Sequence, residues 1–217
     1  MNVPHIILAS NSPRRKQLIQ LLGLPFEIFP ADIDESRNHG EVAKFYVKRL
    51  AQEKALWAAE QKAGLIIAAD TIVVDGDVIL GKPLHVGEAR SMLQSLCGHR
   101  HQVFTAIALI DSVTGRQSLD LCCTAVSMRD YSDDEIDVYI KSGDPFDKAG
   151  AYAIQHQGFN PVKKMDGCFA SVMGLPLCHV VRNLQQMNFD SQVDVPAACQ
   201  KALMYNCQVY ERILENV

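Results

Sequence analysis

The chain has 217 residues, a formal net charge of −4, 48% hydrophobic residues and 21% charged residues. This length allows one large domain or two lobes around a shared cleft, and the composition is ordinary for a soluble globular protein. The acidic balance argues against nucleic acid or membrane partners, and no apolar run reaches the roughly 20 residues that span a bilayer. Seven cysteines without framework spacing fit reduced thiols, so we expect a cytoplasmic protein.

The first predicted element is a short apolar strand at residues 5–9, which ends at a polar turn. Ser12 is suited to cap a helix, and Pro13 to occupy its first turn. A strand, a polar turn and a helix start that carries Arg14 and Arg15 are typical of a phosphate-binding site. A solvated basic first turn is the alternative.

Residues 26–30 are predicted to form a second strand, which leads into an acidic loop containing Glu35. Residues 40–63 then predict one long helix. Lys54 lies on the apolar face of this helix, with Val47, Leu50, Ala51 and Ala58. A lysine on that face either extends past its neighbours to solvent or points into a cleft.

The central stretch, residues 65–80, is an apolar and mostly β-branched run with Asp70 and Thr71 in its middle. It predicts a buried strand, a tight Asp-Gly-Asp turn and a return strand that brings Lys82 back toward Asp70. An ionised carboxylate in such a strand is costly unless it is paired, bound to a metal or open to a cleft. Either these groups form a site for a metal-bound polyanion, or Asp70 satisfies a buried backbone group or pairs with a structural arginine.

The next predicted elements are a helix, two paired strands and a capped helix, at residues 87–96, 102–111, 118–129 and 132–142. His99 and His101 lie between the first two of them. A zinc site needs more ligands than these two histidines offer, so we predict that both are structural.

Residues 144–155 predict a strand of small residues with polar groups at both ends, a pattern that lets a ligand approach the backbone. Gln155 carries an amide donor and acceptor that suit the edge of a nucleobase; alternatively, it satisfies backbone groups. Residues 190–217 predict a polar link and one amphipathic helix, which docks on the body or on a second subunit. We therefore divide the chain into a main domain, residues 1–189, and a C-terminal helical extension.

Several long motifs in this order resemble the Maf (septum formation protein) family of nucleoside triphosphate pyrophosphatases. They are LASNSPRRKQLIQLLG, DIDES, KRLAQEKA, AADTIVVDGDVILGKP, GDPFDKAGAYAIQ and MGLPL. The match extends from about Ile6 to about Leu184, and the sequence looks most like the branch that hydrolyses dTTP and UTP. The resemblance implies an α/β fold of two lobes, with a mixed, bent sheet flanked by helices, a central nucleotide-binding cleft and a homodimer.

The resemblance also implies a reaction, in which water attacks the α-phosphorus of a nucleoside triphosphate and releases the monophosphate and pyrophosphate. Asp70 is the implied general base and, with Glu35, the implied ligand of a divalent cation, Mg²⁺ or Mn²⁺. The specificity pattern of the branch falls on Arg14, Thr71 and Gln155. The other residues expected to bind the substrate are Ser10, Arg15, Lys54, Lys82 and Lys148.

Three other functions fit parts of the sequence. A 7-methyl-GTP pyrophosphatase of the same family would have a different stretch where this chain reads DKAGAYAIQ. A non-catalytic nucleotide-binding regulator of septum formation would use the same residues without turnover. A sugar-nucleotide transferase would need a glycine-rich N-terminal loop with a downstream lysine, which this sequence lacks.

Overall fold

The computed structural model describes residues 5–215, and its centre is a seven-stranded mixed sheet. The strand order is β2-β1-β3-β5-β6-β7, and β4 pairs with β3. β1 pairs in parallel with β2 and β3, and the other pairs are antiparallel. The strands are β1 (Ile6–Leu8), β2 (Phe26–Ile28), β3 (Leu65–Asp75), β4 (Val78–Leu80), β5 (Arg100–Asp111), β6 (Gln117–Met128) and β7 (Val162–Asp166).

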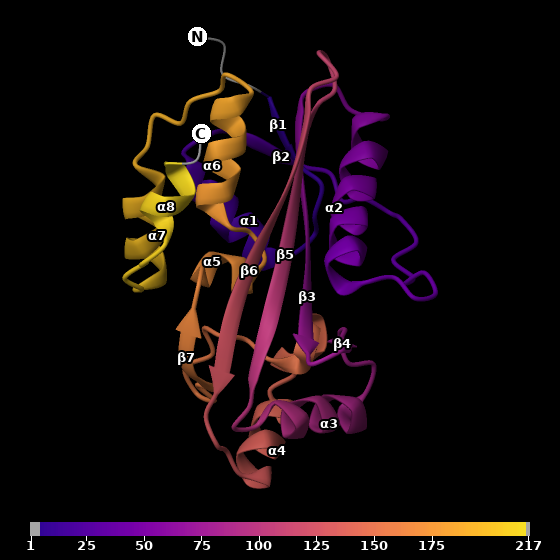
Figure 1. The fold of residues 1–217 in the computed structure, drawn as a ribbon, viewed down its shortest axis with the longest axis vertical. Helices are drawn as coiled ribbons and strands as arrows, with labels where there is room; N and C mark the ends of the chain where they lie inside the picture. Colours follow the sequence, from indigo (N-terminus) through magenta and orange to yellow (C-terminus); the bar gives the residue numbers. More distant parts are fainter. Residues whose placement is uncertain (1–4, 216–217) are drawn as a thin grey trace.

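Helices flank this sheet, which confirms the expected mixed α/β class. They are α1 (Pro13–Ile19), α2 (Ala43–Ala59), α3 (Val86–Leu96), α4 (Asp133–Lys141), α5 (Phe169–Met173), α6 (Leu177–Gln186), α7 (Val195–Leu203) and α8 (Tyr210–Leu214). Three short 3-10 helices are η1 (Gln20–Leu22), η2 (Asp144–Asp147) and η3 (Ala149–Ala151). Figure 1 shows α2 on one side of the long strands, α6, α7 and α8 on the other, and α3 and α4 at the far end.

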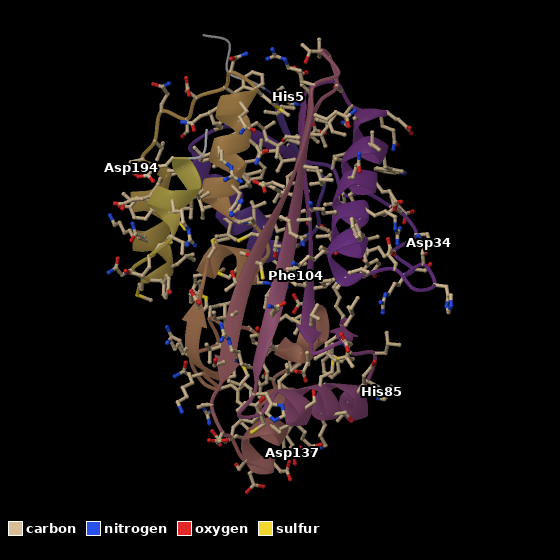
Figure 2. All side chains as sticks on the ribbon, in the orientation of Figure 1. His5, Asp34, His85, Phe104, Asp137 and Asp194 are labelled. Atoms are coloured by element: carbon tan, nitrogen blue, oxygen red, sulfur yellow. The ribbon has the colours of Figure 1, made fainter. Side chains whose placement is uncertain are left out.

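Side chains that alternate along the strands supply separate hydrophobic cores on the two faces of the sheet. Ile6 and Leu8 face the core under α1, α5 and α6, whereas Ile7 faces the core under α2. Phe104, labelled in Figure 2, belongs to the core under α2. A third core lies between α3, α4 and the far ends of β3, β5 and β6. A cleft large enough for a nucleotide lies among these cores.

The turns and caps that depend on local sequence form as expected. The Ser12 side chain accepts a hydrogen bond from the Arg15 backbone N–H, with Pro13 at the first position of α1. Ser132 begins α4 with a complete capping box. Gly76, at φ +57°, allows the tight turn between β3 and β4. Each of these signals involves residues within three positions of one another, so the sequence alone determines them.

The sequence predictions for residues 40–63 and 144–155 were wrong. The helix predicted over residues 40–63 begins only at Ala43, because Gly40 has φ +71° and cannot be part of a right-handed helix. Residues 144–155 form η2, η3 and a turn instead of a strand, because Gly150 and Ala151 have φ of +69° and +60°. The predictions also omitted β7 and α5.

The C-terminal segment forms two helices where one was expected. The chain breaks between α7 and α8 at Met204, which has a left-handed φ of +48°. Val195, Val209 and Ile213 are buried in the same core as β1, so the extension docks on the body of the protein. Whether residues 190–217 behave as a separate unit stays a prediction. None of the helices in the described part of the chain has the length and apolar character to cross a membrane.

Candidate active site

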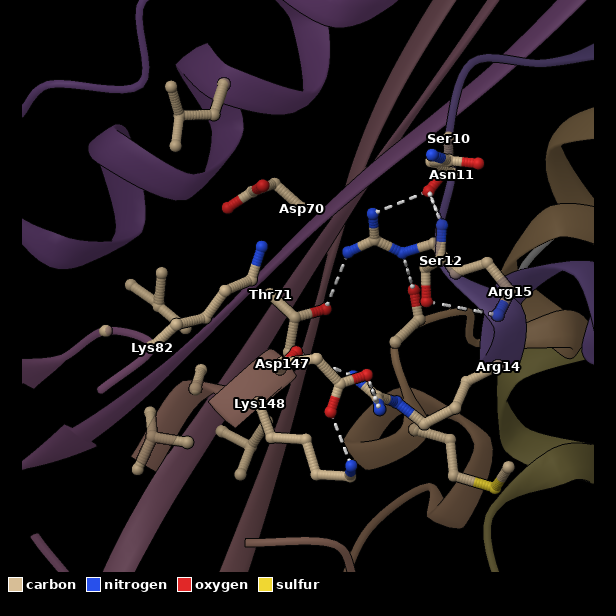
Figure 3. A pocket seen from close by; sticks show the side chains of 18 of the residues that line it. Ser10, Asn11, Ser12, Arg14, Arg15, Asp70, Thr71, Lys82, Asp147 and Lys148 are labelled. Atoms are coloured by element: carbon tan, nitrogen blue, oxygen red, sulfur yellow. Dashed lines mark hydrogen bonds and ion pairs between the residues drawn. The ribbon is translucent and has the colours of Figure 1, made fainter. Parts of the chain in front are cut away.

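A cleft of about 1010 Å³ lies where α1, α2, the middle of β3 and the η2–η3 segment meet. Its volume is at the upper end of the range for small-molecule sites, about 300–1000 Å³, and leaves room for a nucleoside triphosphate. The cleft brings together all ten residues that the sequence singled out, Ser10, Arg14, Arg15, Glu35, Lys54, Asp70, Thr71, Lys82, Lys148 and Gln155. Figure 3 shows that the side chains of most of these residues point toward one another.

Lys54 binds two of the acidic residues of the cleft, Asp70 and Glu35. Its Nζ atom lies 2.6 Å from Asp70 Oδ1 and 2.6 Å from Glu35 Oε1. Both Lys54 and Asp70 are buried, whereas Glu35 is partly exposed. Lys54 therefore points into the cleft instead of extending to solvent, and Asp70 is paired with a lysine instead of a structural arginine.

Charges from several elements act on Glu35. Burial opposes its ionisation, but the hydrogen bond from Lys54 and the positive charges of Lys54, Lys82 and Arg15 together hold the pKa of Glu35 below its ordinary value. The Lys82 side chain extends along the cleft toward Asp70 (Figure 3). Glu35 is therefore a carboxylate at neutral pH.

Arg15 is fixed by three hydrogen bonds to the protein itself. Its guanidinium donates to the Gly174 carbonyl at 2.8 Å, to Ser10 Oγ at 3.2 Å and to Thr71 Oγ1 at 3.3 Å. Ser10 Oγ also accepts from the Ser12 backbone N–H, at 3.2 Å. Arg15 thus holds the polar turn after β1 against β3, which makes it a positioning residue for Ser10 and Thr71.

Arg14 and Lys148 share a carboxylate that the sequence analysis did not assign. Asp147 accepts from Arg14 Nη1 at 2.9 Å through Oδ2, and from Lys148 Nζ at 2.5 Å through Oδ1. Lys148 also donates to Asp144 Oδ1 at 2.9 Å. Burial opposes ionisation of Asp147, but these two cations hold its pKa below the ordinary value. Both basic groups therefore have acidic partners, and a phosphate has to compete with Asp147 for Arg14.

Thr71 connects the cleft to the interior of the sheet. Its hydroxyl lies 2.9 Å from the hydroxyl of Thr105 on β5, and Thr105 donates to the Ser171 carbonyl at 2.8 Å. Gln155 also lines the cleft, on the turn after η3, and is exposed. The amide is therefore presented by a loop and not by the end of a strand.

A divalent cation fits the acidic half of the cleft when a phosphate supplies the remaining ligands. Asp70 and Glu35 use one carboxylate oxygen each on the same Lys54 ammonium, so the two carboxylates converge. Across residues 5–215, no group of three or more His, Cys, Asp or Glu side chains is arranged to hold a metal ion. Mg²⁺ characteristically binds one or two carboxylates together with substrate phosphates and water, which matches this two-carboxylate set.

Sequence reasoning missed Asp144 and Asp147, although a signal was present. Two aspartates flank Pro-Phe immediately before Lys148, so an acidic clamp on that lysine could have been predicted from spacing. It could not have identified Gly174 as the acceptor for Arg15, since 159 positions separate the two residues. Only the packing of α5 against α1 brings them together.

Comparisons with known proteins agree with the motifs. The chain is 43% identical over 183 residues to the dTTP/UTP pyrophosphatase of Syntrophus aciditrophicus, covering 84% of this chain and 89% of the relative. It is 42% identical to the dTTP/UTP pyrophosphatase of Dehalococcoides mccartyi, covering 87% and 84%. The solved structure of a HAM1 protein from Coxiella burnetii aligns with a TM-score of 0.39 at 17% identity, over 57% of this chain and 72% of that one. The family described as Maf-like protein matches residues 5–187, and this chain belongs to it.

Proposed function

We propose that this protein hydrolyses dTTP and UTP to the nucleoside monophosphate and pyrophosphate. One observation carries the proposal: the cleft holds two converging carboxylates, Asp70 and Glu35, close to a set of cationic side chains. The activity named for relatives that are 42% and 43% identical over most of the chain supports the same reaction.

In the proposed reaction, Asp70 orients the attacking water and accepts its proton. A new bond forms between the water oxygen and the α-phosphorus, while the bond from the α-phosphorus to the bridging oxygen breaks and pyrophosphate leaves. Lys54 holds Asp70 in place through the 2.6 Å contact. A general base that is fixed by a hydrogen bond needs little reorganisation during the reaction.

Cationic side chains would balance the charge of the triphosphate. Lys82 faces Asp70 across the cleft, and Arg14 lies on the first turn of α1. Charge on the leaving pyrophosphate grows in the transition state, so these cations contribute more to the transition state than to substrate binding. Arg14 is available only after a phosphate oxygen replaces Asp147 as its partner.

A divalent cation, Mg²⁺ or Mn²⁺, is part of the proposal. Asp70 and Glu35 are the residues that would hold it. When bound, it would neutralise phosphate charge and make a coordinated water more acidic. The proposal predicts no pyrophosphate release after chelation, and recovery when Mg²⁺ or Mn²⁺ is added.

Gln155 and Thr71 are the residues proposed to select a pyrimidine base. Uracil and thymine each present two carbonyl oxygens and one N–H, and a carboxamide carries both a donor and an acceptor for such an edge. A base that cannot satisfy these groups leaves polar atoms unpaired, which lowers its kcat/KM.

Asp70→Asn tests the catalytic assignment. We expect the variant to fold and bind nucleotide but to release pyrophosphate at least about a hundredfold more slowly, which is the usual effect of losing a general base. Asp77→Asn, in the exposed turn after β3, is the matched control and is expected to leave the rate unchanged. Near-normal turnover of folded Asp70→Asn would refute the assignment.

A panel of nucleotides tests the substrate. We expect kcat/KM for dTTP and UTP to exceed the values for CTP, GTP and 7-methyl-GTP. Gln155→Ala should reduce this preference more than it reduces the best rate. Gln157→Ala, another exposed glutamine of the same loop, is the control. An optimum on 7-methyl-GTP would favour the other branch of the family, and binding without pyrophosphate release would favour the regulator of septum formation.

Homodimer formation and a cytoplasmic location stay predictions of the resemblance and the composition. Light scattering on the purified protein measures its mass in solution and tests the dimer directly.

A further inference from the structure

A second polar groove lies outside the nucleotide cleft, against the middle of β6. Its volume is about 280 Å³, room for several molecules the size of water. Asp120 and Cys122 lie two positions apart on β6 and therefore share a face of the sheet. The residues that line the groove include Cys122, Cys168, His179, Arg182 and Arg212.

Asp120 holds the His179 side chain next to this groove. Its Nδ1 atom lies 3.0 Å from Asp120 Oδ2, and the same carboxylate accepts hydrogen bonds from Arg182 and, at 3.1 Å, from Asn183. Burial opposes protonation of His179, but its hydrogen bonds with Asp120 and Cys122 raise its pKa to about 9. An imidazolium beside a thiol favours the thiolate, which is the nucleophilic form of cysteine.

Two buried thiols, those of Cys122 and Cys168, line this groove together. The hydrogen bond from the Cys168 thiol lowers the pKa of Cys122, burial opposes the effect, and His179 lowers it further. The exposed neighbour Cys123 has the opposite behaviour, since burial of its sulfur raises its pKa. Ser171 is fully buried next to Cys122, and a hydrogen bond from its hydroxyl also lowers the pKa of Cys122. Two thiols, an imidazole and two guanidinium groups therefore line one small groove.

We propose that Cys122 reacts with hydroperoxides at this groove and that Cys168 converts the product into an intramolecular disulfide. In the first step the Cys122 sulfur attacks the terminal peroxide oxygen, the O–O bond breaks, and the leaving alkoxide or hydroxide takes a proton from His179. In the second step the Cys168 sulfur attacks the Cys122 sulfenic acid, the S–O bond breaks, and water leaves with the Cys168 proton. Two thiols lose two electrons and the peroxide gains them. The site does not depend on the nucleotide reaction.

Peroxide treatment of the full-length protein followed by peptide mass spectrometry tests this site. We expect a Cys122–Cys168 disulfide, with the loss of two hydrogens, in the wild type and in Cys123→Ser. In Cys168→Ser, we expect a dimedone adduct on Cys122, because the sulfenic acid then has no resolving thiol. Cys168 caps α5 by accepting from the Ser171 backbone N–H, and serine can serve as the same cap, so this variant should fold.

His179→Gln separates the proposal from simple exposure. We expect it to slow oxidation of Cys122 at least about tenfold without changing the reaction of Cys123, because only Cys122 loses its neighbouring cation. The proposal is overturned if Cys122 stays reduced while exposed thiols react, if Cys122 pairs with a cysteine other than Cys168, or if Cys168→Ser gives no dimedone adduct on Cys122.

Discussion

At the scale of single residues, the acidic half of the cleft depends on Lys54. Two carboxylates share its ammonium at 2.6 Å each, and one of them, Asp70, is buried in the middle of β3. Buried carboxylates without a partner are costly, so the contact with Lys54 offsets the cost of burying Asp70 in β3. The helical period placed Lys54 on the inner face of its helix, but its partners follow only from the packing of α2 on β3.

Lys54→Met is expected to destabilise the protein by about 3 kcal/mol, the usual consequence of removing one partner of a buried ion pair. The free energy of unfolding from urea titration measures this. Adding Asp70→Asn to the same chain should recover part of the loss, because the uncompensated charge is then removed.

Lys62→Met is the matched control for this prediction. Lys62 Nζ lies 2.6 Å from Glu27 Oε1, the same distance, but both side chains are more than one third exposed. We expect a loss of less than about 1 kcal/mol there. If Lys54→Met and Lys62→Met lost equal stability, the buried pair would have no special role.

At the scale of elements, the η2–η3 segment determines the shape of the cleft. Asp147 and Lys148 belong to this segment, and Gln155 follows it on the next turn. A hydrogen bond of 3.0 Å from the Gly150 N–H to the Gly81 carbonyl ties the segment to the end of β4. Helices with a local cap and the hairpin with a Gly turn were predictable, because adjacent residues determine them. This segment was not, because its left-handed residues depend on contact with β3.

Gly150→Ala tests that dependence. Gly150 has φ +69°, and a Cβ atom there would lie 3.1 Å from the Val73 side chain. We expect a loss of about 1–2 kcal/mol in stability and weaker nucleotide binding, since the segment must move away from β3. Urea unfolding and nucleotide titration measure the two effects.

Gly143→Ala is the control for the same segment. Gly143 has a similar φ of +78°, but a Cβ atom there would meet no other atom within 4 Å. It should lose about 1 kcal/mol and keep its nucleotide affinity. Equal nucleotide affinities for the two alanine variants would contradict the contact with Val73.

At the scale of the whole molecule, the family resemblance implied the mixed α/β class, and the hydrophobic pattern predicted individual elements better than their bounds. The alternation along β1 and β3 divides the core between the two faces of the sheet, as the apolar runs indicated. The break between α7 and α8 falls at Met204, a residue that carries no turn signal, so the sequence predicted one helix. The residues that line the cleft were predicted more fully than the loops, because they lie in motifs. The contact of Thr105 with Thr71 depends on the pairing of β3 with β5 and could not be predicted in this way.

His101 contacts Tyr152, which belongs to the third core and also lines the cleft. The His101 side chain is buried, its Nε2 atom lies 2.8 Å from the Tyr152 hydroxyl, and burial lowers its pKa to about 4. His101 was predicted to be a structural residue, and its contact with Tyr152 agrees with that.

Because His101 is neutral when folded, the stability of the protein should fall as the pH drops below 6.5. The ordinary histidine pKa is about 6.5, so between pH 6.5 and 4 the unfolded chain binds a proton that the folded chain excludes, and unfolding becomes more favourable. Above pH 6.5 both states are neutral and the effect disappears. At pH 5 the expected loss is about 2 kcal/mol relative to pH 7.5.

Urea unfolding of wild type and His101→Gln at both pH values isolates this loss, since other groups titrate alike in the two proteins and the lost Tyr152 contact is constant. Equal pH dependence in the two proteins would mean that burial does not lower the pKa of His101.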